Sequence, residues 1–235
     1  MPNLRRWSLL VVVLIGFTSC STGTENDSVI EDTSTPTPRA RVRPDTSASS
    51  EVARPRPGAY VYELAGIGGT EVPDGTQLTQ TIAASGDVDF ITVTTNRNDN
   101  TQRLELRWES KRVVQLSNQT TIGGQQRTCV YDPPLEVLHI PMFIEPFDDQ
   151  TFRGAACESK VEIEVVDRDS VKDATGRAWS VWVIETRSEA SGRSDMTTHW
   201  FSPELGRDIR TQTTTETTDR QDQTEQILSR YPGLR

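Results

Sequence analysis

From Gly58 onward, apolar and polar residues alternate along the chain with a period of two. Leu104, Leu106 and Trp108 are separated by charged residues, and residues 160–165 repeat the pattern. Successive side chains of a β-strand point to opposite faces, so each such segment predicts a strand with one buried and one solvated face. This arrangement is typical of antiparallel sheets.

Glycine, asparagine, aspartate and proline residues separate these segments, and no long amphipathic helix interrupts them. Residues 133–149 are irregular, with room for a helical turn. The expected fold class is all-β, or β-rich α+β: a single curved antiparallel sheet or incomplete barrel of about ten strands. The expected strands are 59–64, 76–83, 88–95, 103–109, 112–121, 160–165, 177–186, 196–201, 207–215 and 224–231.

One expected strand is apolar on both faces. Trp179, Val181 and Val183 alternate with Trp182 and Ile184. A strand of this kind is covered on both sides. In one interpretation, one face lines a concave apolar interior and the irregular segment before it covers the other face. The alternative is an ordinary central strand of a packed sandwich.

The first residues have the layout of an export signal. Arg5 and Arg6 precede an apolar run over residues 9–17, and small residues follow. The run has roughly half of the ~20 apolar residues that a membrane-spanning helix needs. We therefore expect residues 1–19 to be a signal peptide that is removed.

The end of this signal, Phe17-Thr18-Ser19-Cys20, resembles the bacterial lipobox, although Phe17 stands where the lipobox usually has leucine. Both residues are bulky and apolar. The resemblance implies a lipid on Cys20, and a doubly acylated cysteine suffices for stable anchoring at the extracytoplasmic face of the cell membrane. The alternative is plain secretion, with Cys20 as an incidental thiol.

The sequence divides into three parts. After the signal peptide, residues 20–57 comprise the lipidated cysteine and a tether rich in Ser, Thr and Pro. Such a segment buries too little apolar surface to offset its ordering entropy, so we expect it to be disordered. Residues 58–235 form the predicted β-rich extracytoplasmic domain.

Charge restricts the partners. The chain has 25 Lys and Arg against 34 Asp and Glu, which gives a net charge of −9 and no basic cluster. This argues against binding to nucleic acid or to anionic lipid headgroups. Lysine is scarce and arginine abundant, which indicates a GC-rich genome and, together with the lipobox, favours an actinobacterial origin.

The chain contains three cysteines. With Cys20 assigned to the lipid, Cys129 and Cys157 remain as a pair, and thiol pairs outside the cytoplasm oxidise. We therefore predict a Cys129–Cys157 disulfide. Their separation does not fit a Cys-x-x-Cys redox motif.

Motifs for catalysis and for metal binding are absent from the sequence. His139 and His199 have no second ligand at a suitable spacing. The spacing of Asp167, Asp169 and Asp173 matches a calcium-binding loop only in part, because an apolar residue occupies a required ligand position. We expect no catalytic residues, no metal and no cofactor, and we do not expect an enzyme.

Residues 200–207 (WFSPELGR) are similar to the aromatic-x-Pro-x-x-Gly turn of half-barrel proteins of the lipoprotein-localisation carrier type. Lipid-carrying lipoproteins of mycobacteria share that fold. The resemblance implies an incomplete antiparallel barrel whose concave apolar face holds acyl chains. No ligand-binding residue can be carried over, because the motif is a turn.

These observations favour a membrane-anchored extracytoplasmic lipoprotein that binds a lipid or another apolar ligand in a curved β-sheet. A ligand of that kind requires an apolar cavity of roughly several hundred Å³. The alternative is a structural or protein-interaction ectodomain of the cell envelope without a ligand cavity. The expected partners are the membrane, through Cys20, and an apolar small molecule; nucleic acid is not expected, and the sequence identifies no protein partner.

Overall fold

The computed structural model describes residues 51–84, 90–97, 100–142, 150–152, 159–190 and 192–233. All regular elements in these ranges are strands, as the period-two alternation predicts. They are β1 (Gly58–Ile67), β2 (Gln77–Ala84), β3 (Phe90–Arg97), β4 (Asn100–Trp108), β5 (Arg112–Ile122), β6 (Gln125–His139), β7 (Gln150–Phe152), β8 (Ser159–Lys172), β9 (Ala178–Ala190), β10 (Arg193–Ser202), β11 (Arg207–Thr217) and β12 (Arg220–Arg230).

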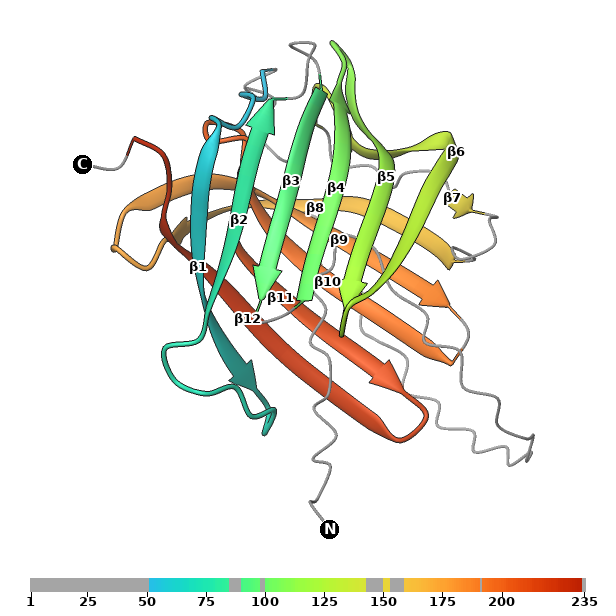
Figure 1. Ribbon diagram of the computed structural model, residues 1–235. Helices are drawn as coiled ribbons and strands as arrows, with labels where there is room; N and C mark the ends of the chain where they lie inside the picture. Colours follow the sequence, from blue (N-terminus) through green and yellow to red (C-terminus); the bar gives the residue numbers. More distant parts are fainter. Residues whose placement is uncertain are drawn as a thin grey trace.

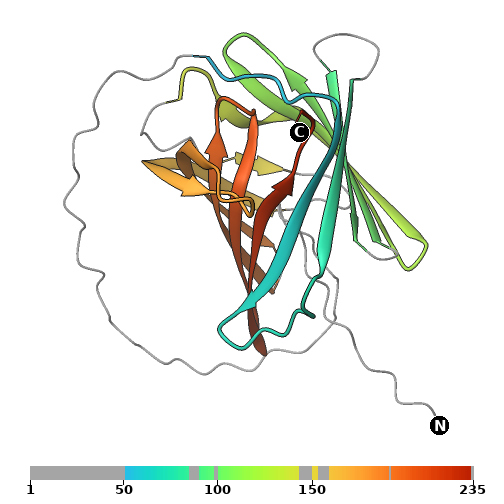
Figure 2. The same cartoon turned by 90° about the vertical axis from the view of Figure 1, so that its left-hand side faces the viewer.

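All twelve strands belong to one antiparallel sheet with the order β6-β5-β4-β3-β2-β1-β12-β11-β10-β9-β8-β7. Consecutive strands are neighbours except for β6 and β7, which are the two ends of this order. In the middle of the sheet β1 pairs with β12, where Tyr62 lies opposite Leu228. The sheet curls so that its β2–β6 half faces its β8–β11 half (Figures 1 and 2). The single curved antiparallel sheet predicted from the sequence is confirmed, with twelve strands in place of about ten.

The hydrophobic core fills the space between these two halves. Leu104 and Leu106 contribute from β4, while Val161 and Ile163 contribute from β8, and all four are at most 6% exposed. The charged residues between them lie on the outer face of the sheet. The alternation that predicted these strands thus also identified their buried face.

The interior changes polarity along the strands. At one end, which we call the apolar end, Trp108 lies opposite Val113 across β4 and β5. Toward the other end of the same strands, Gln102 donates a hydrogen bond to Asn118 inside the core. In the facing half, β10 and β11 likewise bury hydroxyl side chains and the ionisable side chains of Asp195, His199 and Arg207 rather than an unbroken apolar surface.

Strand β6 corrects one expectation, since residues 133–139 were expected to be irregular. They continue the strand and pair with β5, after a register shift in which Gln115 faces Leu135 and Ser117 faces Val130. Proline cannot donate a hydrogen bond to a neighbouring strand, so it is tolerated at bulges and on edge strands. β6 is an edge strand of the sheet, and its two prolines lie at this register shift.

Strand β9 is buried on both faces where the sequence is apolar on both. Val181 is 3% exposed and the adjacent Trp182 is 5% exposed. The guanidinium of Arg168 lies 4.0 Å from the centre of the Trp182 ring. The covering segment expected over residues 133–149 is not confirmed, because 133–139 belong to β6 and 143–149 lie outside the described residues.

Strand β8 extends to Lys172 and includes Asp167 and Asp169, which pair with β9 after a register shift that follows Val165. The turn that follows is organised by Asp173, whose side-chain oxygens accept four hydrogen bonds. The donors are the Thr175 amide and hydroxyl, the Arg177 amide and the Trp179 indole, at 2.6–3.1 Å. Burial alone would raise the pKa of Asp173, but these hydrogen bonds outweigh burial and lower the pKa below its ordinary value.

We predict that Asp173→Ala lowers the free energy of unfolding by about 2–4 kcal/mol, because it leaves the buried Trp179 indole and three part-buried donors without this acceptor. A lowered pKa means that the stabilisation is present above the unfolded carboxyl pKa of about 3.9 and is lost as the pH falls below it. Urea denaturation from pH 7 down to pH 3 measures both effects. Asp169→Ala changes an exposed aspartate of β8, the strand before this turn; it is the control and should change stability by no more than about 0.5 kcal/mol.

Candidate functional site

The site residues expected from the sequence are placed only in part. Cys20 and Cys157 lie outside the described residues, so the lipidation and the disulfide stay predictions. Cys129 lies in β6 with a side chain that is 9% exposed. Within the described part of the chain, no three His, Cys, Asp or Glu side chains are grouped to hold a metal ion.

A large pocket opens at the apolar end of the sheet, with a volume of about 1140 Å³. We call it the outer pocket. Six separate segments contribute to it: the residues before β1, the start of β3, the end of β4 with the β4–β5 turn, the residue after β6, the start of β9, and the β10–β11 turn. Its lining consists of Glu51, Val52, Ala53, Arg54, Phe90, Arg107, Trp108, Glu109, Ser110, Ile140, Ser180, Pro203 and Glu204.

Residues 51–57 form one wall of the outer pocket, and we call them the strap. The Ala53 amide donates a hydrogen bond to the Pro203 carbonyl at 2.8 Å, and Pro55 is buried. The Tyr60 hydroxyl donates to the Arg56 carbonyl at 3.0 Å. These residues were expected to be the end of a disordered tether; in the structure they pack against the sheet instead.

The strap depends on a glycine in the β10–β11 turn. The Gly206 amide donates a hydrogen bond to the Ser202 carbonyl at 2.8 Å, which confirms a tight turn at the motif noted in the sequence. Gly206 has φ +67°, and a Cβ atom at this position would overlap the carbonyl oxygen of Ala53. The glycine therefore permits both the turn and the close approach of the strap.

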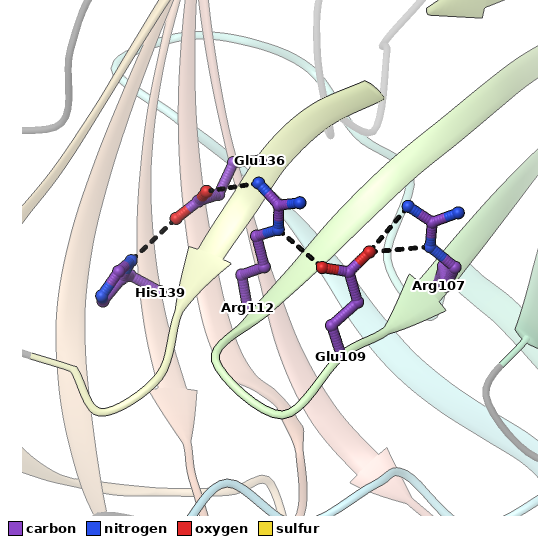
Figure 3. Close-up of polar contacts among 5 residues, drawn as sticks. All are labelled: Arg107, Glu109, Arg112, Glu136 and His139. Carbon is purple, nitrogen blue, oxygen red and sulfur yellow. Dashed lines mark hydrogen bonds and ion pairs between the residues drawn. The ribbon is translucent and has the colours of Figure 1, made fainter. Parts of the chain in front are cut away.

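Figure 3 shows a chain of polar contacts that begins at Arg107 and Glu109, two residues that line the outer pocket. Glu109 accepts hydrogen bonds from Arg107 at 2.8 Å and from Arg112 at 2.6 Å. Arg112 also lies 3.7 Å from Glu136, which contacts His139 Nδ1 at 2.9 Å. The β4–β5 turn and the end of β6 thus carry alternating charges that are mutually paired.

The pKa of Glu109 lies below its ordinary value. The hydrogen bond from Arg112 is the main cause, burial opposes it, and Arg107 adds a further hydrogen bond. Glu109 therefore remains ionised throughout the physiological range, with guanidinium groups on both sides. A ligand at this rim meets positive and negative groups that are already oriented.

The chemistry available in the outer pocket is that of an amphipathic site. Val52, Phe90, Trp108 and Ile140 provide apolar surface, and the ion pairs around Glu109 provide a charged rim. Ligand pockets typically combine apolar walls with a few fixed polar groups in this manner. The pocket is therefore suited to a molecule with an apolar part and a polar or zwitterionic part.

The interior between the two halves of the sheet is mostly filled by the protein's own side chains. A cavity of about 80 Å³, which we call the inner cavity, lies next to Trp108, Ile184 and Phe201. Binding of an apolar ligand in the curved sheet was expected to require an apolar cavity of roughly several hundred Å³, and the inner cavity is much smaller. The larger volume lies instead at the open end of the sheet.

Sequence reasoning missed the outer pocket because its lining residues are scattered along the chain. The one local signal is the junction Trp108-Glu109-Ser110, where an aromatic residue ends a strand beside an acidic turn. The sequence did not distinguish the strap from the tether, because the two segments have similar compositions.

We predict that Gly206→Ala displaces the strap and lowers the free energy of unfolding by about 1–3 kcal/mol. The amides of residues 51–57 should then exchange hydrogen faster, as measured by mass spectrometry. Gly176→Ala is the matched control, since Gly176 also has a positive φ of +88° but a Cβ atom added there would have no neighbouring atom within 4 Å. Unchanged exchange of the strap in Gly206→Ala would contradict this role of the turn.

No helix in the described ranges has the length and apolar character to span a membrane. Comparison with family models yields no match, and comparison with curated proteins yields none either. Among solved structures, the chain is similar to the crystal structure of the hypothetical lipoprotein YmcC from Escherichia coli (K12). The two share 10% sequence identity over 76% of this chain and 87% of that chain, with a TM-score of 0.34. A likeness this low supports no statement about activity or location.

Proposed function

We propose that this protein is a membrane-anchored lipoprotein of the extracytoplasmic face that binds a lipid or another apolar ligand. The outer pocket is the binding site, and the lipid on Cys20 is the anchor. The volume of about 1140 Å³, bordered by apolar side chains and by paired charges, is the observation that carries the proposal. A volume of this size accommodates an amphipathic small molecule.

The anchor and the pocket are separate parts of the proposal. The anchor rests on the order of charged, apolar and small residues before Cys20 and on the similarity of residues 17–20 to the lipobox. The pocket rests on the contacts of the strap with the β10–β11 turn. Either part can fail while the other stands.

The proposed activity is binding without catalysis. Ser110 and Ser180 are the hydroxyl side chains of the pocket lining. Neither forms a hydrogen bond with His139 or His199 in the described part of the chain. A nucleophilic serine requires such a base within hydrogen-bond reach.

The binding proposal predicts that Ser180→Trp blocks the outer pocket. Ser180 is exposed and lines the pocket, so an indole there occupies ligand volume without disturbing the core. The probe is dodecylphosphocholine below its micellar concentration, which pairs an apolar chain with a zwitterionic head. Isothermal titration calorimetry should show one saturable site in the wild-type protein and at least about tenfold weaker binding in the variant, because ~1.4 kcal/mol of binding energy corresponds to a factor of ten.

The control is Thr81→Trp, which places the same side chain on the outer face of β2, away from the pocket. It should bind the probe as the wild type does. Equal binding by Ser180→Trp and wild type would contradict the outer pocket as the site.

One observation favours a second function, that of a structural or protein-interaction ectodomain. Side chains fill most of the space between the two halves of the sheet, where the inner cavity has a volume of about 80 Å³. A domain without an enclosed ligand requires a packed interior of this kind. This function predicts no saturable binding of the probe and no lipid in organic extracts of the natively purified protein. Mass spectrometry of those extracts therefore separates the two functions.

The anchor predicts a defined mature N-terminus. In a bacterium that lipidates its own lipoproteins, mass spectrometry of the full-length product should find Cys20 as the first residue, carrying acyl chains. Cys20→Ser should lose the acyl mass and leave the membrane fraction, whereas Ser19→Ala keeps a small residue before the cysteine and should be processed normally. A wild-type N-terminus at another residue would contradict the assignment.

A further inference from the structure

The guanidinium of Arg207 is buried inside the sheet. Arg207 begins β11 and is 7% exposed. Its Nη2 atom donates a hydrogen bond to the side-chain oxygen of Gln80, and the guanidinium lies 5.9 Å from the centre of the Tyr60 ring. Its Nε atom is buried and has no partner.

Among the residues that the structure describes, no carboxylate forms an ion pair with Arg207. Burial raises the pKa of the nearby Tyr62 to about 12, against the opposing effect of Arg207 itself, so this phenol is neutral. Buried charges in proteins are normally paired, and an unpaired one marks a missing partner.

A second unsatisfied polar atom lies in the same region. His199, on β10, is 5% exposed, and its Nδ1 atom lies 3.1 Å from the Asp208 carboxylate. The other ring nitrogen, Nε2, is buried without a partner. The contact with Asp208 orients the ring and leaves Nε2 as the atom available to a ligand.

Both residues line the inner cavity. Its other polar side chains are Thr186 and Asp208, the carboxylate that contacts His199 Nδ1. The remaining walls are mainly apolar, with Leu106, Val113 and Ile184 among them. The volume of about 80 Å³ is enough for a few water molecules or for a small organic acid. It is too small for a long acyl chain unless the walls move.

We propose that the inner cavity binds a short-chain monocarboxylate, in the size range of acetate to butyrate. The Nε–H group of Arg207 donates a hydrogen bond to one carboxylate oxygen and the ligand supplies the missing negative charge. His199 Nε2 bonds to the other oxygen, through a proton carried by the ring or by the acid. The aliphatic carbons of the ligand lie against the apolar walls.

This site is distinct from the outer pocket and does not depend on the function proposed for that pocket. Trp108 contributes to both linings and so forms part of the boundary between them. Ser180→Trp, which fills the outer pocket, should leave monocarboxylate affinity within a factor of about two. Failure of either site can therefore be recognised separately.

The first test compares sodium propionate with propionamide, a neutral molecule of nearly the same shape. Propionate should raise the melting temperature of the protein saturably at constant ionic strength, since a ligand that binds only the folded state stabilises it. Propionamide and an equal concentration of sodium chloride should leave it unchanged. Palmitate is the third arm: a shift with palmitate and none with propionate would assign the carboxylate to a long-chain acid and overturn the short-chain proposal.

The second test removes the charge. Arg207→Met should abolish the propionate shift without lowering the melting temperature of the unliganded protein, because it removes an uncompensated buried charge. Arg210→Met is the matched control: Arg210 lies on the same strand but pairs with Glu225 and lies 4.8 Å from the Trp200 ring. This variant should keep the propionate shift.

If Arg207→Met does not fold, Val113→Leu replaces it as the decisive variant. It keeps Arg207 and extends an apolar side chain into the inner cavity, so it should weaken propionate binding at least tenfold. Equal shifts with propionate and propionamide, or an undiminished propionate shift in Val113→Leu, would overturn the proposal.

Discussion

The pairing of β1 with β12 is the contact on which the rest of the structure depends. It joins the first and last strands of the described chain in the middle of the sheet, with Tyr62 opposite Leu228. Without it, β1–β6 and β7–β12 would be two separate meanders, each with an additional open edge and an uncovered apolar face. With it, one continuous sheet curls until its two halves share a core (Figure 2).

The same closure explains why the interior is filled while the open end is not. Where the two halves approach, side chains from facing strands occupy nearly all of the volume, as close packing in protein interiors requires. At the apolar end the strands stop, and turns and the strap must cover what the sheet leaves open. The outer pocket lies among these turns and the strap, so its lining comes from six segments of the chain.

Much of the fold could be predicted from the sequence because a strand that is buried on one face alternates apolar and polar residues with a period of two. Leu104, Leu106 and Val161 show it clearly. β6 could not be predicted in full, because its prolines indicate a loop and are tolerated only owing to its edge position. The strap could not be predicted either, because the contact of Ala53 with Gly206 joins residues far apart in sequence. The composition of residues 51–57 also gives no indication of this contact.

The position of the strap has a mechanical consequence. Glu51, the first described residue, lies in the wall of the outer pocket, so a pull transmitted along the chain from its N-terminal side is applied first to that wall. The strap is not paired as a strand of the sheet, and the Ala53–Pro203 hydrogen bond is its backbone contact with the β10–β11 turn. Tension would therefore peel the strap from the turn before it loaded the paired strands, and the mouth of the pocket would widen while the sheet stayed intact.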